Sequence, residues 1–346
     1  PGDTARARCF WNETNMAAQP GLKAFDLFDA VADGRVKAVW IAATNPADTM
    51  PRAARVREAL AKCPLVIVSD AWPTDTTALA DIVLPAAGWA EKDGTVTNSE
   101  RCISRQRVFR ASPGEARPDW WMFAQVARRM GWENAFAYRG PADIFREHAA
   151  LSAFENDGTR VFDIGALAGL DDAAYTALAP VQWPCPRPGH GRTGPRLFAR
   201  GGFPTPDGRA RMLPLSVKTE MAQDDYPLTL NTGRVRDQWH TMTRTGRVAH
   251  LMGHVSEPRL ALHPRDAAQA GIEDGEFARL ESPHGQMVLR ASIDTSMRRG
   301  DAFVPMHWTD QFASSGPIDR LVHAVTDPVS GQPDLKGTRV RASAVA

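Results

Sequence analysis

Short apolar runs alternate with amphipathic segments between residues 20 and 90, and this alternation leaves few folds open. Two of the runs are KAVWIAATNP at 37–46 and PLVIVSDAW at 64–72, and both lead into polar turn residues. A helical segment that opens on Pro51 separates them, and a third run follows at 82–84. Continuous apolar strands that alternate with helices predict part of a doubly wound parallel α/β sheet with both faces covered.

The sequence changes in character after Tyr226, where short strands are separated by Gly, Pro and Asp turns. This spacing predicts a closed β-barrel, whose clearest element is a hairpin at His284-Gly285. A length of 346 residues suffices for two or three domains. We therefore expect an α/β domain over 1–150, an irregular connecting segment over 151–222 and a barrel domain over 223–346.

Composition excludes several classes of protein. The net charge of +1 gives no bulk attraction to nucleic acid. The sequence contains no run of 18 apolar residues, so it predicts no membrane-spanning helix. No P-loop, HExxH, Gly-x-Ser-x-Gly or intact GxGxxG motif occurs, so the sequence lacks the motifs that would indicate a hydrolase or an ATPase. The first residues have neither Met nor a signal-type apolar region, and they read like the middle of a domain, so we expect a fragment.

Cysteine and histidine spacing offers no metal centre. Cys9, Cys63, Cys102 and Cys185 are scattered, which argues against a zinc or iron–sulfur site built from this chain alone and favours a reducing cytoplasm. His307 and His323 lack a third ligand at suitable spacing. The sequence therefore predicts that no metal is ligated by these residues.

Polar residues follow the predicted strands at the edge where doubly wound sheets bind ligands. Asn45 comes after the first strand, and Ser69 and Asp70 come after the second. Lys92 follows the third strand, where its ammonium group could meet a phosphate. The alternatives are ordinary turn chemistry for the first three residues and a solvated loop for Lys92.

The stretch NTGRVRDQWHTMTRT at 231–245 is a stronger signal, because it combines three arginines with many hydroxyl and amide groups. Gly233 follows a strand and allows backbone N–H groups to face an anion. Arg234 and Arg236 could neutralise phosphates. The alternative is a solvated loop between strands. The last segment of the chain also gathers polar side chains among turns, and it is a second candidate for ligand binding. These residues are His307, Trp308, Asp319, Asp327, Gln332 and Lys336.

Several phrases taken together resemble the molybdopterin oxidoreductase family, and more closely the C-terminal part of the cytoplasmic assimilatory nitrate reductases. They are ATNPADTMPRAARVREAL, VSDAWPTDTTALADIVLPAAGWAEKDGTVTNSER, GEARPDWW, TGRVRDQWHTMTRT, EPRLALHPRDAAQAGIEDGE and TDPVSGQPDLK. The resemblance covers most of the chain with the motifs in order. It implies a dinucleotide-binding α/β domain, a C-terminal double-psi β-barrel and a cofactor of molybdenum with two molybdopterin guanine dinucleotides.

The resemblance carries cofactor contacts onto matching positions of this sequence. These are Asn45, Ser69, Asp70, Lys92, Asp119, Thr232, Gly233, Arg234, Val235, Arg236, Asp237, Gln238, Trp239, His240, Thr241, Trp308, Asp319, Gln332 and Lys336. Asp319 stands where relatives often have Asn, and a carboxylate there lacks the amide's donor unless it is protonated.

The implied activity is oxygen-atom transfer from nitrate to give nitrite. The substrate funnel would be formed by His240, Thr241, Met242, Thr243 and Arg244. The [4Fe-4S] cluster and the molybdenum ligand belong to the N-terminal half in this family, so that half is an implied partner and this chain alone should not reduce nitrate. The electron donor would be a reductase subunit, ferredoxin or flavodoxin. Formate dehydrogenase-like and periplasmic nitrate reductase-like enzymes, and a non-catalytic cofactor-binding module, remain alternatives.

Overall fold

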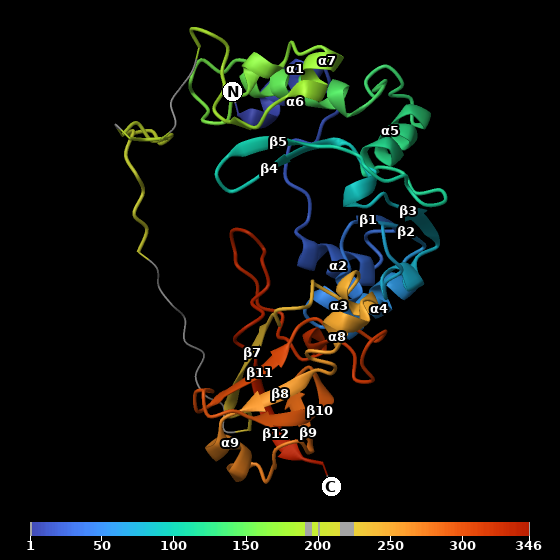
Figure 1. Ribbon diagram of the computed structural model, residues 1–346, viewed down its shortest axis with the longest axis vertical. Coiled ribbons are helices and arrows are strands. Elements are labelled where there is room, and N and C mark those ends of the chain that lie inside the picture. Colours follow the sequence, from blue (N-terminus) through green and yellow to red (C-terminus); the bar gives the residue numbers. More distant parts are fainter. Residues whose placement is uncertain (1, 191–195, 200, 215–224, 346) are drawn as a thin grey trace. The chain divides into compact units, whose positions relative to one another are not determined.

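A computed structural model describes residues 2–190, 196–199, 201–214 and 225–345 (Figure 1). The chain forms two compact units. One contains Pro1–Pro20 and Ala86–Ser216, and the other contains Gly21–Pro85 and Val217–Ala346. No helix in the described parts of the chain is both long and apolar enough to cross a membrane. The predicted boundary at 222 lies outside the described residues, and the three predicted domain ranges stay a prediction.

A three-stranded parallel sheet forms the first part of the larger unit, which confirms the predicted parallel strands. Strands β1 (Ala38–Ala42), β2 (Leu65–Asp70) and β3 (Ile82–Pro85) lie in that order. Helices α2 (Ala24–Ala32) and α4 (Ala53–Lys62) pack with one face of β1 and β2, through the buried residues Phe28, Val31, Val39, Ile41, Val56, Leu60, Val66 and Val68.

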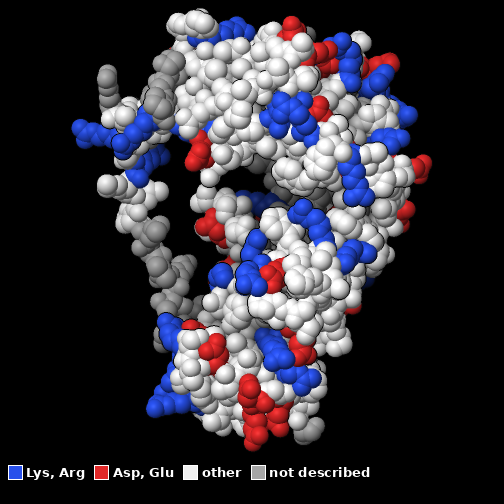
Figure 2. All heavy atoms as spheres, viewed as in Figure 1, with Lys and Arg blue, Asp and Glu red and all other residues white. Residues whose placement is uncertain are grey.

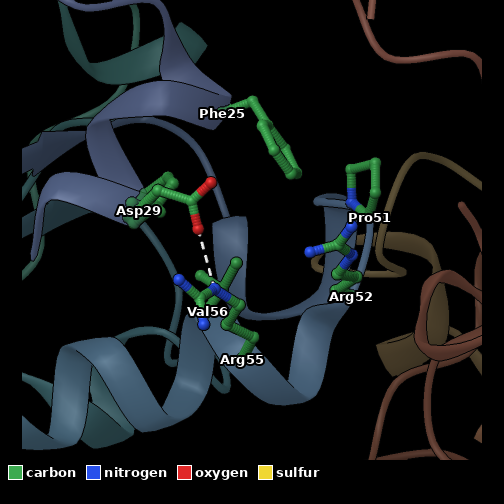
Figure 3. Close-up of a pocket in the computed structure, with 7 residues that line it drawn as sticks. Phe25, Asp29, Pro51, Arg52, Arg55 and Val56 are labelled. Atoms are coloured by element: carbon green, nitrogen blue, oxygen red, sulfur yellow. Dashed lines mark hydrogen bonds and ion pairs between the residues drawn. The ribbon is translucent and has the colours of Figure 1, made fainter. Parts of the chain in front are cut away.

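The same sheet is less covered elsewhere than the sequence predicts. Trp40 and Ile67, on the other face of β1 and β2, are only partly buried, and Ile82 and Val83 of β3 are exposed. Arg55 of α4 donates to Asp29 of α2 at 2.7 Å and ties the two covering helices together (Figure 3). The short helices α3 (Pro46–Thr49) and η1 (Thr77–Leu79) follow β1 and β2.

A closed six-stranded barrel forms the second part of the larger unit and confirms the predicted barrel. Its strands are β7 (Leu228–Gly233), β8 (Arg259–Leu262), β9 (Phe277–Ser282), β10 (Gly285–Ile293), β11 (Asp301–Pro305) and β12 (Arg339–Ala344). They close in the order β10-β8-β11-β7-β12-β9, with β10/β8 and β11/β7 parallel. Alternate residues fill the interior, among them Leu230, Leu260, Leu262, Leu280 and Val304, all fully buried.

Short helices decorate the barrel. They are η4 (Thr245–Arg247), α8 (Ala249–Met252), α9 (Pro264–Gln269) and η5 (Ile318–Arg320). Strands β9 and β10 form the hairpin predicted at His284-Gly285. Figure 1 shows α8 and α9 at opposite ends of the barrel. Basic and acidic side chains are intermixed on the face shown in Figure 2, in keeping with the small net charge.

The smaller unit is built around the hairpin of β4 (Gly94–Thr97) and β5 (Cys102–Gln106), to which β6 (Val181–Gln182) adds. Its helices are α1 (Asp3–Trp11), η2 (Trp89–Glu91), α5 (Asp119–Arg129), α6 (Pro141–Ala153), η3 (Gly165–Leu167) and α7 (Asp172–Ala177). Ile164 and Tyr175 share a core with Ile103 and Phe145, so the start of the segment expected to be irregular is packed structure.

Candidate functional site

The loop that follows β7 begins at Gly233, where the neighbouring side chain leaves no room for a Cβ atom. A Cβ on Gly233 would lie 2.8 Å from Cε2 of Phe303 on the neighbouring strand β11. Gly233 is not among the residues with positive φ, and its predicted role toward an anion stays a prediction. Two later residues of the same loop, His240 and Met242, do take positive φ values of 44° and 61°. The backbone therefore departs from common conformations where the loop turns back.

Arginine side chains gather around one tryptophan of this loop. The guanidinium carbons of Arg234 and Arg244 lie 5.6 and 5.0 Å from the ring centroid of Trp239, which is 44% exposed. Arg247 lies 5.5 Å from the ring centroid of Trp72, next to the sheet. Within the described residues, none of these three arginines has a carboxylate partner, so their charge is available to an anion.

Other loop residues are used by the protein itself. Arg236 pairs with Asp237 at 2.9 Å. Gln238 is buried and accepts a hydrogen bond from Thr245 Oγ1 at 2.7 Å. Met242 is fully buried, and Thr243 is partly buried. Their proposed roles toward a ligand stay predictions, and the observed contacts of Arg236 and Gln238 are structural.

The pKa of the His240 imidazole lies below its ordinary value of 6.5, which favours the neutral ring at pH 7. Burial is the main cause of its lowered pKa, and the charges of Arg234 and Arg244 lower the pKa further. The exposed imidazole can therefore both donate and accept a hydrogen bond beside two guanidinium groups.

The polar residues after β1 and β2 are brought to the barrel loop. Asn45 donates to Thr241 Oγ1 at 3.1 Å and to Asp48 at 2.7 Å, and its carbonyl accepts from the Thr76 hydroxyl at 2.6 Å. Ser69 accepts from the indole of Trp40 at 2.7 Å. The buried Asn45 and Ser69 thus bond within the protein, while Asn45 links the sheet edge to the loop.

Asp70 also has a local bond, since it accepts the backbone N–H of Trp72 at 2.9 Å. It holds the turn at the end of β2, where the sequence predicted a ligand contact.

A charged cluster next to Asn45, which begins at its hydrogen-bond partner Asp48, was not predicted from the sequence. Arg57 of α4 contacts Asp48 at 2.6 Å, Asp75 at 3.0 Å and also Asp310, which pairs with Arg320 at 2.8 Å. Burial of Asp48 and the nearby charge of Asp75 outweigh Arg57 and raise the pKa of Asp48 to about 7. No local motif marks this cluster, because its members lie far apart in the chain.

The segment after β11 supplies buried polar groups. His307 and Trp308 are 0% and 1% exposed. In the described residues, the buried Nε1–H of Trp308 has no hydrogen-bond partner. Burial also raises the pKa of Asp319 to about 7, so this carboxyl group is partly protonated at neutral pH and can donate as the expected amide would.

Two further predicted residues lie around the end of β7. Lys336 donates to the backbone carbonyl of Thr232 at 2.6 Å and to Asn231 at 3.1 Å, while the Thr232 hydroxyl donates to the Leu335 carbonyl at 2.8 Å. Gln332 is exposed in the turn before Lys336. The end of β7 and the turn at Lys336 are thereby held side by side.

Lys92 and Asp119 belong to the smaller unit, where they pair with each other at 3.3 Å. The other carboxylate oxygen of Asp119 is buried and lacks a hydrogen-bond partner among the described residues. Across those residues, no three His, Cys, Asp or Glu side chains gather as a metal site would require.

Two family models match the chain. Molybdopterin oxidoreductase matches residues 4–129, and the molydopterin dinucleotide binding domain matches residues 228–339. The second range contains strands β7 to β11 of the barrel and the segment Arg234–Arg247, which carries the three arginines and is called the arginine loop below. The chain belongs to the molybdopterin oxidoreductases. This family assignment confirms the resemblance drawn from the sequence.

Curated relatives of this molybdopterin oxidoreductase include nitrate reductases and a formate dehydrogenase. A nitrate reductase of Klebsiella oxytoca is 50% identical over 98% of this chain and 39% of its own length. The assimilatory nitrate reductase catalytic subunit of Bacillus subtilis is 31% identical over 93% of this chain and 44% of its own. The F420-dependent formate dehydrogenase subunit alpha of Methanocaldococcus jannaschii is 30% identical over 96% and 46%. The chain thus spans less than half the length of these relatives.

Among solved structures, acetylene hydratase from Pelobacter acetylenicus aligns with a TM-score of 0.72 and 21% identity. The alignment covers 92% of this chain and 46% of that one, and at this identity it supports the fold alone.

Proposed function

We propose that this molybdopterin oxidoreductase chain forms one wall of a site for molybdenum bound to two molybdopterin guanine dinucleotides. The observation that carries the proposal is the group of three arginines around Trp239 and Trp72 that have no carboxylate partner in the part of the chain that the structure describes. A dinucleotide brings phosphates for the guanidinium groups and acceptors for a buried donor. The unpartnered Nε1–H of Trp308 fits such a ligand, because leaving that donor unpaired costs about 1–3 kcal/mol.

The residues of this chain would bind and orient the cofactor. Arg234 and Arg244 would neutralise phosphate or substrate charge, and Trp308 would donate to a pterin or nucleotide acceptor. Neutral His240 and the Thr241 hydroxyl lie in the same loop and would face a small anion. When bound, molybdenum supplies the oxygen-atom transfer chemistry, while these groups hold the ligands and exclude water.

The finer fold belongs to the same proposal. Two parallel strand pairs, β10/β8 and β11/β7, in a closed six-stranded order support a double-psi barrel. The exposed Ile82 and Val83 of β3, together with the partly buried Trp40, support a doubly wound sheet that is completed by residues outside this chain.

We further propose that the whole enzyme is an assimilatory nitrate reductase that converts nitrate to nitrite. Support comes from the nitrate reductase relatives, which reach 50% and 41% identity where the formate dehydrogenases reach 30–32%. The remaining parts would be an N-terminal half with a [4Fe-4S] cluster and an electron donor such as a reductase subunit, ferredoxin or flavodoxin. Four free cysteines support a cytoplasmic location.

The proposal is tested on the full-length enzyme produced with molybdate. We expect molybdenum and GMP in about a 1:2 ratio after acid release, as two guanine dinucleotides per metal require, and we expect reduction of nitrate by a reduced dye. A folded enzyme with neither molybdenum nor GMP would refute the cofactor assignment. Formate oxidation without nitrate reduction would instead refute the substrate and leave the cofactor standing.

Replacing Arg244 tests the substrate path. We expect Arg244→Ala to raise the nitrate KM by about three- to tenfold with a smaller change in kcat, because an exposed cation attracts an anion before reaction. Steady-state kinetics at low ionic strength measure the effect. Arg265→Ala, an exposed arginine on α9 at the other end of the barrel, is the control. An unchanged KM for Arg244→Ala would remove this residue from the substrate path.

A further inference from the structure

His307 ties together two points of the arginine loop, Val235 and His240. It lies just beyond β11 and is fully buried. The backbone N–H of Val235 donates to His307 Nε2 at 3.0 Å, and His307 Nδ1 lies 2.6 Å from the backbone carbonyl oxygen of His240. One imidazole therefore contacts the beginning and the end of a six-residue segment, Val235–His240.

These two partners fix the form of the ring. A carbonyl oxygen can only accept, so Nδ1 carries the proton and donates to His240. A backbone N–H can only donate, so Nε2 must present its lone pair to Val235. The geometry is satisfied only by the neutral tautomer with the proton on Nδ1. A protonated ring would place an N–H at Nε2 against the N–H of Val235, and that bond would be lost.

The two hydrogen bonds to His307 stabilise a loop whose own backbone conformation is unfavourable. His240 holds a φ of 44°, a conformation that is unfavourable for a residue with a side chain. Inside the segment, the backbone bond from Gln238 to Val235 is long, at 3.4 Å. Arg234 and Trp239 stand immediately outside and within the tied segment, so their positions depend on it.

We propose that neutral His307 is a positioning residue that clamps Val235–His240, and that protonation of His307 releases this loop. The inference rests on the proposed function only for the identity of the ligand that the loop binds. The clamp makes the anion-binding arrangement of Arg234 and Trp239 present before any ligand arrives, and acidification dismantles it.

The surroundings of His307 favour the clamped form at neutral pH. Burial is the largest cause of the lowered pKa of His307, and the charges of Arg234 and His240 lower the pKa further, against a smaller raising effect of the bond to the His240 carbonyl. Because the folded pKa lies below the ordinary value of 6.5, the clamp is complete above pH 6.5. It is lost as the pH falls through the folded value.

Hydrogen exchange measured by mass spectrometry on the full chain, without cofactor, tests the clamp. The variants are His307→Ala, His307→Gln and the control His263→Ala, which removes an imidazole that likewise accepts a backbone N–H, that of Arg265 on α9. At pH 7.5 we expect protection of peptides covering 233–242 to fall about tenfold or more in His307→Ala, since two hydrogen bonds are lost. His307→Gln should keep part of the protection, and His263→Ala all of it. Equal protection in wild type and His307→Ala would overturn the proposal.

The same exchange experiment at different pH values tests whether protonation of His307 releases the loop. Protection factors of the same peptides should fall in the wild type as the pH is lowered from 7.5 through the folded pKa of His307, which lies below 6.5, and they should be constant in His307→Gln. Acid loss that persists in His307→Gln would assign it to another group, such as His240, and would refute release by His307. If His307→Ala does not fold, His307→Gln and the wild-type pH comparison still decide the question.

The outcome is separable from the proposed function. Absence of molybdenum and GMP from the full-length enzyme would refute the cofactor while leaving the exchange result intact. An unclamped loop in an enzyme that does contain cofactor would refute the clamp alone.

Discussion

Asp48 and Asp319 are two buried acids whose carboxyl groups are partly protonated at neutral pH. Both have a pKa raised to about 7, with burial as the largest cause, although Asp48 contacts Arg57 and no described cation pairs with Asp319. For Asp319 this raised pKa has a chemical meaning, because the protonated carboxyl group can donate where the family resemblance leads one to expect an amide.

The Asp319 carboxyl group makes stability depend on pH. Its pKa rises from 3.8 unfolded to about 7 folded, so the folded state binds the proton more tightly and the free energy of unfolding falls as the pH rises from about 4 to 7. We expect Asp319→Asn to be more stable than wild type at pH 8, by about 1–3 kcal/mol, with the difference shrinking toward pH 4.5. Thermal unfolding across this range measures it.

The control for this measurement is Asp294→Asn, since Asp294 is solvent-exposed and its pKa is lowered by bonds to Ser296. It should show no stabilisation at high pH. A wild-type and Asp319→Asn difference that does not change between pH 4.5 and 8 would contradict the assignment of the buried proton.

At the scale of elements, strand β7 governs the site because it sets where the arginine loop starts. Gly233 is its last residue, and the Phe303 ring of β11 occupies the space that a side chain would need. The sequence predicts a role for this glycine toward an anion, and the structure adds a steric reason that the sequence does not show, since contact with Phe303 arises from strand pairing between residues 70 positions apart. Spacing along the chain carries no record of that approach.

Gly233→Ala should destabilise the barrel by about 1–3 kcal/mol, because the Phe303 ring must move from its packed position. Urea unfolding measures the change. Gly253→Ala serves as the control, since its nearest contact is 3.5 Å away and its φ is −72°. Adding Phe303→Leu should recover part of the loss. If the double variant is no better than Gly233→Ala, the ring is not the obstacle.

At the scale of the larger unit, a polar interface joins the sheet to the barrel. Asn45 bonds to Thr241, and Arg57 of α4 contacts Asp310 beyond β11. Gln311 also donates to the Pro73 carbonyl at 3.3 Å. These contacts span some 200 residues of sequence and hold the edge of the sheet against the arginine loop.

Arg57→Met should weaken this interface. The substitution leaves Asp48 and Asp75 near each other without their shared cation, and we expect a loss of about 2–4 kcal/mol, reduced from the value for a fully buried pair because Arg57 is partly exposed. Urea unfolding followed by limited proteolysis should reveal separate transitions for sheet and barrel. Asp48→Asn in the Arg57→Met background should restore part of the stability. Arg55→Met, on the same helix with an exposed partner, is the matched control.

Much of this architecture was predictable, because local patterns report local structure. Apolar runs at Val39–Ile41 and Val66–Val68 marked the parallel strands, and turn residues around His284-Gly285 marked the barrel hairpin. Side-chain roles were harder to predict. The sequence offers His307 as a candidate metal ligand or as one of the polar groups of the last segment, and neither reading predicts its contacts with Val235 and His240. Met242, which the resemblance places in the substrate funnel, is buried. The clamp and the Asp48–Arg57–Asp310 cluster depend on tertiary contacts that no spacing in the sequence encodes.

The position of β12 between β7 and β9 affects how the chain can be synthesised. Arg339 of β12 bonds to Thr229 of β7 across 110 residues, so the cylinder cannot be sealed until the final strand has emerged from the ribosome. Until then β7 and β9 each present an open edge to other nascent chains. Substitutions in β12 are therefore expected to cause inclusion bodies and dependence on chaperones. The fraction of the enzyme that does fold should have normal activity.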